Sequence, residues 1–435
     1  MPSFSFIRSF YHRYQDRIRL WFWVHLSALV LGVLVFWFFH PHGPDIVRRL
    51  AEKPGFLLTI YDEKSCEGCH KKIDPGMYKQ WAESVHFRVN VGCADCHGND
   101  HEAAFSAKGK VSAGTCGKCH EREVTDFAES GHATTEADAV VNARFLSQSP
   151  AIQQEGCMGC HSIGARFADG SVGACNKCHP GHEFSSGMAR EPEACEVCHI
   201  GPDHPQVEAY RTSVHGVLYF SHRDPERAPT CATCHMPQGA HGKQNTLTLG
   251  EIASGAVSDA EPPPSIPMRR MGKEQITENR KRMLAICAPC HSLRFVRENL
   301  ERADAIKREA DALVAEGRAI LEGLEQDGML VPMPDARPAH PVAGHTMVLG
   351  GQQTYENTSA IEQAFFRLYK FYHAKTYKAA YHHSPDYMHW KGIVFMKMEL
   401  DKIRSEAKWL RRNGYKTSPR IDAMLPENGT TEGGE

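Results

Sequence analysis

All sixteen cysteines of this 435-residue chain fall in one repeated pattern, Cys-x-x-Cys-His, which occurs eight times. Two thiols three residues apart can form thioethers to the two vinyl groups of one haem, and the adjacent histidine can bind the iron as its proximal ligand. Zinc sites would not place a histidine after every second cysteine, and a disulfide framework would not need one. The pattern therefore predicts eight covalently bound haem c groups. The motifs are Cys66/Cys69/His70, Cys93/Cys96/His97, Cys116/Cys119/His120, Cys157/Cys160/His161, Cys175/Cys178/His179, Cys195/Cys198/His199, Cys231/Cys234/His235 and Cys287/Cys290/His291.

The second axial ligand decides what each iron can do. A haem that only transfers electrons usually has two protein ligands, whereas an open sixth position lets the iron bind substrate. Eight of the 26 histidines belong to the motifs and four precede them, which leaves fourteen for the opposite faces. A seventh partner is expected from the Pro-rich loop, at His345 or His340, so one of the eight irons is predicted to stay open. Context favours six others as distal ligands: His86, His101, His132, His182, His215 and His241.

An acid stands next to an imidazole at Asp203-His204, a few residues after the sixth motif. An imidazole ordinarily titrates near neutrality and can accept protons, and a neighbouring carboxylate can orient it. From the residues alone, His204 could instead be a haem ligand, and Asp203 could be a turn residue after Pro202. A part in an active site is therefore one of three interpretations.

The N-terminal segment predicts a membrane anchor. Residues 20–39 read LWFWVHLSALVLGVLVFWFF, twenty residues without a formal charge, which is enough to cross a hydrocarbon core. Tryptophans lie near both ends, as in an aromatic belt. A cleaved signal peptide would have a shorter apolar region that ends in small residues. We expect a single-pass protein of the cytoplasmic membrane with its bulk in the periplasm, because haem c is attached outside that membrane.

The remaining chain predicts a mainly α fold. Gaps between motifs are short and rich in Gly, Pro and charge, which favours short helices and little strand. Apolar residues at helical spacing predict long helices over 295–325 and 358–377, and a third from Ser384-Pro385 to about residue 412. The expected architecture is a multihaem cytochrome c array followed by a bundle of long C-terminal helices. The predicted domains are a cytoplasmic basic N-terminus (1–19), a transmembrane anchor (20–39), a linker (40–60), an octahaem-binding domain (61–293), a C-terminal helical domain (294–415) and a disordered tail (416–435).

The charge balance excludes one class of partner. The chain has 50 Lys and Arg against 52 Asp and Glu, a formal net charge of −2 at pH 7. Haem propionates would make the holoprotein more acidic still. Because nothing is basic enough to bind a polyanion, we expect no nucleic-acid partner.

From about Cys66 to Trp409 the sequence resembles the hydroxylamine oxidoreductase family of octahaem cytochromes c. The membrane anchor is a departure, since soluble periplasmic members are typical of the ammonia-oxidising branch. The resemblance rests on the eight motifs in order and on four segments: His-Glu-Phe-Ser at 182–185, Ala-Arg-Glu-Pro-Glu-Ala-Cys at 189–195, Gly-Pro-Asp-His-Pro-Gln at 201–206 and His-Ser-Pro-Asp-Tyr-Met-His-Trp at 383–390.

The resemblance implies a particular active site. The fourth haem, held by Cys157, Cys160 and His161, would be catalytic with an open distal face, and Asp203 and His204 would face it.

The resemblance also implies a homotrimer. In oxidising members a tyrosine from the C-terminal helices of a neighbouring subunit cross-links to the catalytic haem. The matching position looks like Tyr387, with Tyr377 and Tyr381 as nearby competitors. The active site would then span two subunits.

The expected reaction is oxidation of hydroxylamine to NO or nitrite at the fourth haem. Seven bis-histidine haems would pass the electrons to a cytochrome c or a quinone-linked membrane cytochrome. Relatives that lack the tyrosine run reductively, from nitrite or hydroxylamine to ammonium, so a reductive enzyme is the alternative. A pure electron conduit with every iron six-coordinate is the interpretation from a different class.

Overall fold

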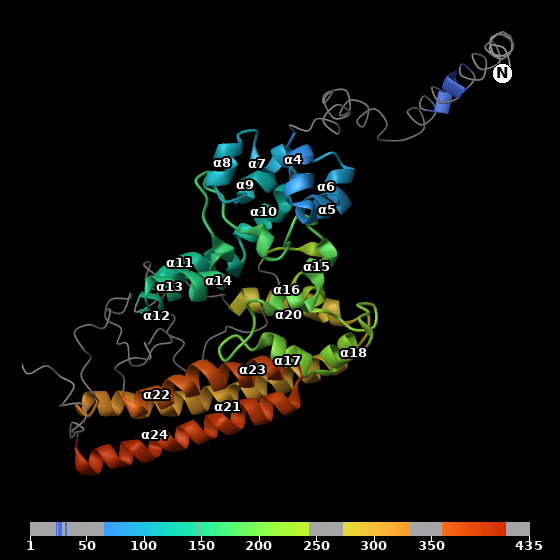
Figure 1. Cartoon of the computed structure of the whole chain (residues 1–435). Helices are drawn as coiled ribbons and strands as arrows, with labels where there is room; N and C mark the ends of the chain where they lie inside the picture. The colour runs from blue at the N-terminus through green and yellow to red at the C-terminus, as the bar shows by residue number, and fades with distance from the viewer. Residues whose placement is uncertain are drawn as a thin grey trace, which may run out of the picture. The chain divides into compact units, whose positions relative to one another are not determined.

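The computed structural model describes residues 65–141, 143–146, 148–242, 273–330 and 359–414, together with 23, 25–27 and 31–32 (Figure 1). Within these ranges the chain forms helices joined by turns, and the β structure consists of a single bridge between Arg166 and Val172. The prediction of a mainly helical chain with almost no strand is confirmed. The described chain divides into two compact units, Met1–Ala94 and Asp95–Glu435.

Several predicted features lie outside the described residues. These are most of the 20–39 anchor, the 40–60 linker, the Pro-rich loop with His345, and the tail from residue 416. Among the helices that the structure does describe, none combines the length and the apolar character needed to cross a membrane. The anchor therefore stays a prediction from the sequence.

The first unit contains three short helices, α4 (Cys66–Ile73), α5 (Pro75–Glu83) and α6 (Val85–Arg88), and the start of α7 (Cys93–His97). Each of the first three begins at a side chain that accepts a hydrogen bond from a backbone N–H of the first turn: Ser65 from Gly68, Asp74 from Met77, and Ser84 from Phe87. Helices this short are marginal in isolation. The caps therefore fix where each helix starts.

The second unit begins with short helices that carry most of the haem motifs. In a helix, residues i, i+3 and i+4 share one face, so a helical turn places both thiols and the histidine of a motif toward one haem. The elements are α8 (His101–Ser106), α9 (Ala113–Gly117), α10 (Glu121–Ala128), η1 (Gly131–Thr134), α11 (Thr135–Val140), α12 (Ala143–Leu146), α13 (Pro150–Ile152), η2 (Gln153–Cys157), α14 (Met158–His161), η3 (Ser162–Gly164), η4 (Cys175–Lys177), α15 (Ser186–Arg190), α16 (Pro192–Glu196), α17 (Gln206–Arg211), α18 (Val214–His222), α19 (Cys231–His235), η5 (Pro237–Gly239) and α20 (Lys273–Cys287).

The C-terminal part of this unit is a bundle of long helices. The 34-residue α21 (Leu293–Gln326) lies beside two other long helical segments (Figure 1). One consists of α22 (Ala360–Phe366), η6 (Arg367–His373) and α23 (Ala374–Tyr381). The other is η7 (Tyr387–Ile393) followed by α24 (Val394–Asn413). The predicted long helices are thus present. Their shared core includes Val314, Leu321, Leu324, Phe365, Leu368, Met396, Leu400 and Ile403.

Three segments, η2, η6 and η7, are π-helical. Such wide turns are rare and often occur at functional sites. One ends at Cys157 of the fourth motif, and another begins at Tyr387. Close packing accompanies η7, because a Cβ at Gly392 would lie 2.5 Å from the Thr376 hydroxyl of α23. The glycine therefore lets η7 approach α23 directly.

Candidate haem and catalytic site

Among the residues that the structure describes, five motif histidines face a second imidazole at a spacing that leaves room for a metal. Because a metal–imidazole nitrogen bond is about 2 Å long, two rings that ligate one metal from opposite sides have centroids about 6 Å apart. The side chains present therefore fit a covalent haem with two axial imidazoles at these five motifs. The ring-centroid distances are 6.3 Å for His97–His182, 5.9 Å for His199–His132, 6.4 Å for His179–His241, 5.9 Å for His291–His215 and 6.3 Å for His235–His382.

Four of these partners, His132, His182, His215 and His241, are distal ligands predicted from the sequence, and the ligand assignments themselves stay predictions. The fifth, His382, was not foreseen. Its Nδ1–H donates to the Lys378 carbonyl oxygen at 2.6 Å, which leaves Nε2 as the nitrogen able to bind a metal. The available signal was its place in the corner before Ser384-Pro385, the predicted start of the last helix.

The other predicted ligands are placed as follows. His86 lies in α6 and His101 opens α8, while the motif residue His70 lies within α4 and His120 directly precedes α10. The predicted seventh partner, His345, lies outside the described residues.

Four motif thiols differ from the rest in their exposure. Cys66 and Cys69 of the first motif, Cys119 of the third and Cys290 of the eighth are exposed, whereas the other twelve are partly buried. The motif therefore occurs in surroundings of different exposure along the chain.

The physical reason lies in the local structure around these four cysteines. Cys66 and Cys69 lie on the short helix α4, which has no buried residue. Cys119 follows the end of α9, and Cys290 lies in the turn after α20. Thioether formation needs only that both thiols of a motif reach one haem edge, and sequence spacing provides that without burial. Haem attachment at Cys66, Cys69, Cys119 and Cys290 thus rests on motif spacing and stays a prediction.

His161 of the fourth motif is oriented as a proximal ligand would be. Its Nδ1 lies 3.1 Å from the Thr135 carbonyl oxygen, and the Thr135 hydroxyl donates back to the His161 carbonyl at 2.8 Å. A histidine held through Nδ1–H presents Nε2 to a metal. The residue pair Thr135 and His161 thus fixes the ring from α11, and η2 leads directly into Cys157.

The fourth motif adjoins the sixth. Cys160 Sγ is 3.8 Å from the Val197 carbonyl oxygen, and burial followed by the nearby Cys160 thiol raises the pKa of Cys198 to about 12. Attachment points this near would place their haems side by side, as an electron-transfer chain requires. Two more pairs of motif thiols are near enough to shift each other's pKa, Cys116 with Cys175 and Cys195 with Cys231.

Asp203 and His204 form the predicted acid–imidazole pair. His204 Nδ1 donates to Asp203 Oδ1 at 2.9 Å, and both side chains are partly exposed. The carboxylate thereby orients the ring, as proton transfer through Nε2 requires. The His204 ring centroid also lies 6.4 Å from that of His199, which faces His132 at 5.9 Å. The active-site and the ligand interpretations of His204 both stay predictions.

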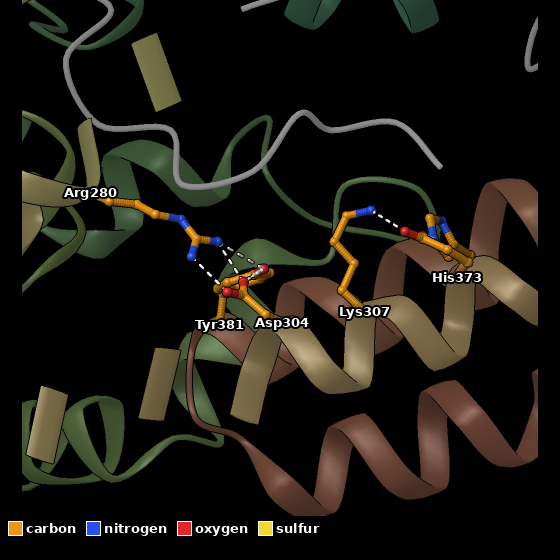
Figure 2. Close-up of polar contacts among 6 residues, drawn as sticks. Arg280, Asp304, Lys307, His373 and Tyr381 are labelled. Atoms are coloured by element: carbon orange, nitrogen blue, oxygen red, sulfur yellow. Dashed lines mark hydrogen bonds and ion pairs between the residues drawn. The ribbon is translucent and has the colours of Figure 1, made fainter. Parts of the chain in front are cut away.

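Tyr387 opens η7 and is half-exposed. Burial, followed by the nearby Glu208 carboxylate, raises the pKa of Tyr387 to about 12. Its competitors are engaged inside the bundle. The Tyr377 ring packs against His373 at 5.0 Å between centroids. Tyr381 donates to Asp304 and accepts from Arg280, as Figure 2 shows.

Comparison with known proteins identifies the family. Residues 89–338 match the family model described as seven times multi-haem cytochrome CxxCH. This stretch covers more than half of the chain and contains seven of its motifs, the second to the eighth.

The chain belongs to this multihaem cytochrome family.

Relatives of the cytochrome include a probable nitrite reductase–hydroxylamine oxidoreductase fusion protein of Kuenenia stuttgartiensis. It is 26% identical over 82% of this chain and 52% of its own length, so the cytochrome spans about half of that relative. A chain of the Kuenenia stuttgartiensis reducing HAO-like protein complex superposes with a TM-score of 0.61 and 27% identity, covering 80% of this chain and 85% of that one. A hypothetical multihaem protein superposes with a TM-score of 0.63 at 18% identity, over 80% and 95% of the two chains, which shows a shared fold. The predicted resemblance to the hydroxylamine oxidoreductase-like cytochromes is confirmed.

The family and the paired imidazoles together identify the Cys-x-x-Cys-His motifs as sites of covalent haem c. The cytochrome therefore belongs to the redox proteins. That all eight motifs are loaded stays a prediction.

Proposed function

We propose that this cytochrome is an oxidoreductase that acts on small nitrogen compounds at the fourth haem, with the other seven haems serving as a path for electrons. Haem at the fourth motif would supply an iron that exchanges electrons with the nitrogen compound. The observation that carries the proposal is the hydrogen bond between Asp203 and His204. These two residues closely follow the sixth haem motif, and the sixth motif neighbours the fourth.

The chain's own residues would handle protons. Oxidation or reduction of a nitrogen compound moves protons together with electrons. Asp203 holds His204 through Nδ1, so Nε2 is the atom that would accept or release a proton. General acid–base catalysis of this kind contributes about 10²- to 10⁴-fold to a rate.

The proposed direction is oxidation of hydroxylamine to NO or nitrite. Tyr387 supports this direction, because a tyrosine at its position cross-links to the catalytic haem in the oxidising members that the sequence resembles. Its half-exposed position suits contact with a neighbouring subunit, and we propose a homotrimer.

Reduction of nitrite or hydroxylamine to ammonium is the second candidate. Two lysines, Lys370 and Lys378, approach Asp203, and cationic side chains favour an anion such as nitrite. The names of the two Kuenenia stuttgartiensis relatives, one a probable nitrite reductase fusion and one a reducing complex, agree with this candidate.

For the cellular setting, we propose that residues 20–39 anchor the cytochrome in the cytoplasmic membrane with its bulk in the periplasm. The uncharged twenty-residue sequence supports this proposal. The redox partner would be a cytochrome c or a quinone-linked membrane cytochrome.

The test uses the purified holoprotein with each substrate in each direction. Hydroxylamine-dependent reduction of an added oxidant, with a ferrous absorption band distinct from that of ordinary haem c, would support oxidation. Consumption of nitrite or hydroxylamine with a chemical reductant, and ammonium as product, would establish the reductive candidate. Eight low-spin six-coordinate irons and no turnover in either direction would leave the electron conduit.

A further inference from the structure

The acid–imidazole pair is held by the C-terminal bundle. We infer that Lys378 is a positioning residue for Asp203 and His204, and that its side chain acts on the reaction through them. This inference rests on the proposed function. It gives the bundle a direct part in building the site.

The backbone of the pair depends on one ammonium group. Lys378 Nζ, on α23, donates to the Asp203 carbonyl oxygen at 2.9 Å. The side-chain amide nitrogen of Gln206 donates to the His204 carbonyl oxygen at 2.7 Å, and its amide oxygen accepts from Lys378 Nζ at 3.3 Å. One lysine thus holds the Asp203 carbonyl directly and the His204 carbonyl through Gln206.

The turn before the pair is held from the other side. Gly201 has a φ of +97°, which an L side chain rarely adopts. Its N–H donates to Glu208 Oε1 of α17 at 2.8 Å. Because α17 packs against α23, the segment lies between a carboxylate at its start and an ammonium at its end.

Two lysine ammonium groups, of Lys370 and Lys378, lie near Asp203. Lys370 Nζ lies 3.9 Å from Asp203 Oδ2. Burial, reinforced by Lys370, lowers the pKa of Lys378 to about 8, while Asp203 and Glu208 act in the opposite direction. Lys378 is therefore still mainly charged at neutral pH, and its bond to the carbonyl is charge-assisted. Replacing it by an apolar side chain would leave the Asp203 carbonyl without this donor.

The main chain of Lys378 provides an internal control. Its carbonyl oxygen accepts from His382 Nδ1, and a side-chain substitution leaves that carbonyl in place. A Lys378→Met variant should therefore release the Asp203–His204 turn without disturbing the orientation of His382.

The kinetic experiment is a double-variant cycle with the holoprotein, in whichever direction the wild type turns over. Lys378→Met should lower kcat by about tenfold to hundredfold, as misplacement of a catalytic pair by about 1 Å does, with KM changed less than about threefold and haem content unchanged. In a His204→Ala background the same substitution should cost less than about twofold. Equal losses in both backgrounds, or an unchanged kcat, would overturn the inference. The matched control is Lys397→Met, which removes an exposed lysine paired with Glu309 across the bundle and should leave kcat unchanged.

Two further measurements keep the test decisive. If Lys378→Met loses haem, Gln206→Met is the second variant, because it removes the amide that links Lys378 to the His204 carbonyl. It should lower kcat about threefold to tenfold when His204 is present and have no such effect in the His204→Ala background. An unchanged kcat in the presence of His204 would overturn the inference. A crystal structure of the Lys378→Met holoprotein tests positioning without turnover. The Asp203–His204 turn should move by about 1 Å or more while His382 stays in place. An unmoved turn refutes the inference even if the proposed function fails, and absence of wild-type turnover refutes only the proposed function.

Discussion

His235, in the seventh haem motif, faces His382 of the C-terminal bundle with 6.3 Å between their ring centroids. The two residues come from parts of the chain that the sequence predicts as separate domains. This spacing predicts that the bundle supplies an imidazole to the haem of the seventh motif, so that the packing of the bundle would set the geometry of that haem.

The first prediction concerns His382. His382→Ala should convert one haem from low-spin to high-spin, because the iron loses its sixth ligand. Electron paramagnetic resonance of the oxidised holoprotein measures the change. The matched control is His345→Ala, which removes the seventh distal ligand that the sequence predicted. If His382 takes that place, the control should show no new high-spin signal. A new high-spin signal in the His345 variant and none in the His382 variant would contradict the assignment.

The second prediction concerns Asp203. Asp203→Asn should leave haem content intact and lower turnover by about 10²- to 10⁴-fold, because the amide no longer orients His204 as the carboxylate does. Steady-state rates with hydroxylamine and with nitrite measure the effect. Asp401→Asn, at an exposed carboxylate on α24, is the control and should behave as wild type. Unchanged rates in the Asp203 variant would remove this residue from the mechanism.

The third prediction concerns the tyrosine cross-link. Tyr387→Phe should abolish the unusual ferrous absorption band expected of a cross-linked haem and shift the enzyme toward reduction. Tyr377→Phe and Tyr381→Phe are the controls, since both side chains are engaged within the bundle. Loss of the band in either control, with none in the Tyr387 variant, would transfer the cross-link to that position.

The fourth prediction concerns a buried ionic cluster in the bundle. Asp311 accepts from His373 Nε2 at 2.7 Å and from Lys307 Nζ at 2.6 Å, and all three side chains are less than a tenth exposed. The Lys307 and His373 partners are drawn in Figure 2. Removing one member of such a cluster leaves a buried charge uncompensated, so Asp311→Ala should lower the free energy of unfolding by about 3–5 kcal/mol. Urea unfolding followed by circular dichroism measures this. Glu316→Gln, which removes an exposed pair with Arg404, should have little effect.

The same cluster predicts a pH dependence. Burial raises the pKa of Asp311, but the hydrogen bonds from His373 and Lys307 outweigh it and leave the pKa below its ordinary value of 3.8. Burial lowers the pKa of His373 below its ordinary 6.5, against the effect of Asp311. Both groups bind protons less readily in the folded state, so their contribution to stability is complete above pH 6.5 and is lost as the pH falls, first for His373 and then for Asp311. Urea midpoints from pH 7 to pH 4 should fall, and constant midpoints would contradict the assignment.

Local chemistry is what the sequence determines in this protein. The Cys-x-x-Cys-His motifs identify haem attachment because the two thiols and the proximal imidazole are adjacent in the chain, and a helical turn presents them together. The same holds for helix ends such as Ser384, and for the Asp203–His204 bond between neighbouring residues. Histidines such as His182, close to a motif in sequence, were also found in this way.

The tertiary structure alone decides the contacts between distant segments. Lys378 reaches Asp203 across 175 residues, and His382 of the bundle faces His235 of the seventh motif. No local pattern encodes these pairs, because they depend on how α23 packs against α21 and α17. The exposure of Cys66, Cys69, Cys119 and Cys290 is likewise decided by packing, since the motif is the same at all eight positions. From the sequence alone, a lysine on a helix is expected to be solvated, and only the packing shows that it is buried. A histidine in the turn after a helix becomes a candidate ligand only when another imidazole lies about 6 Å away.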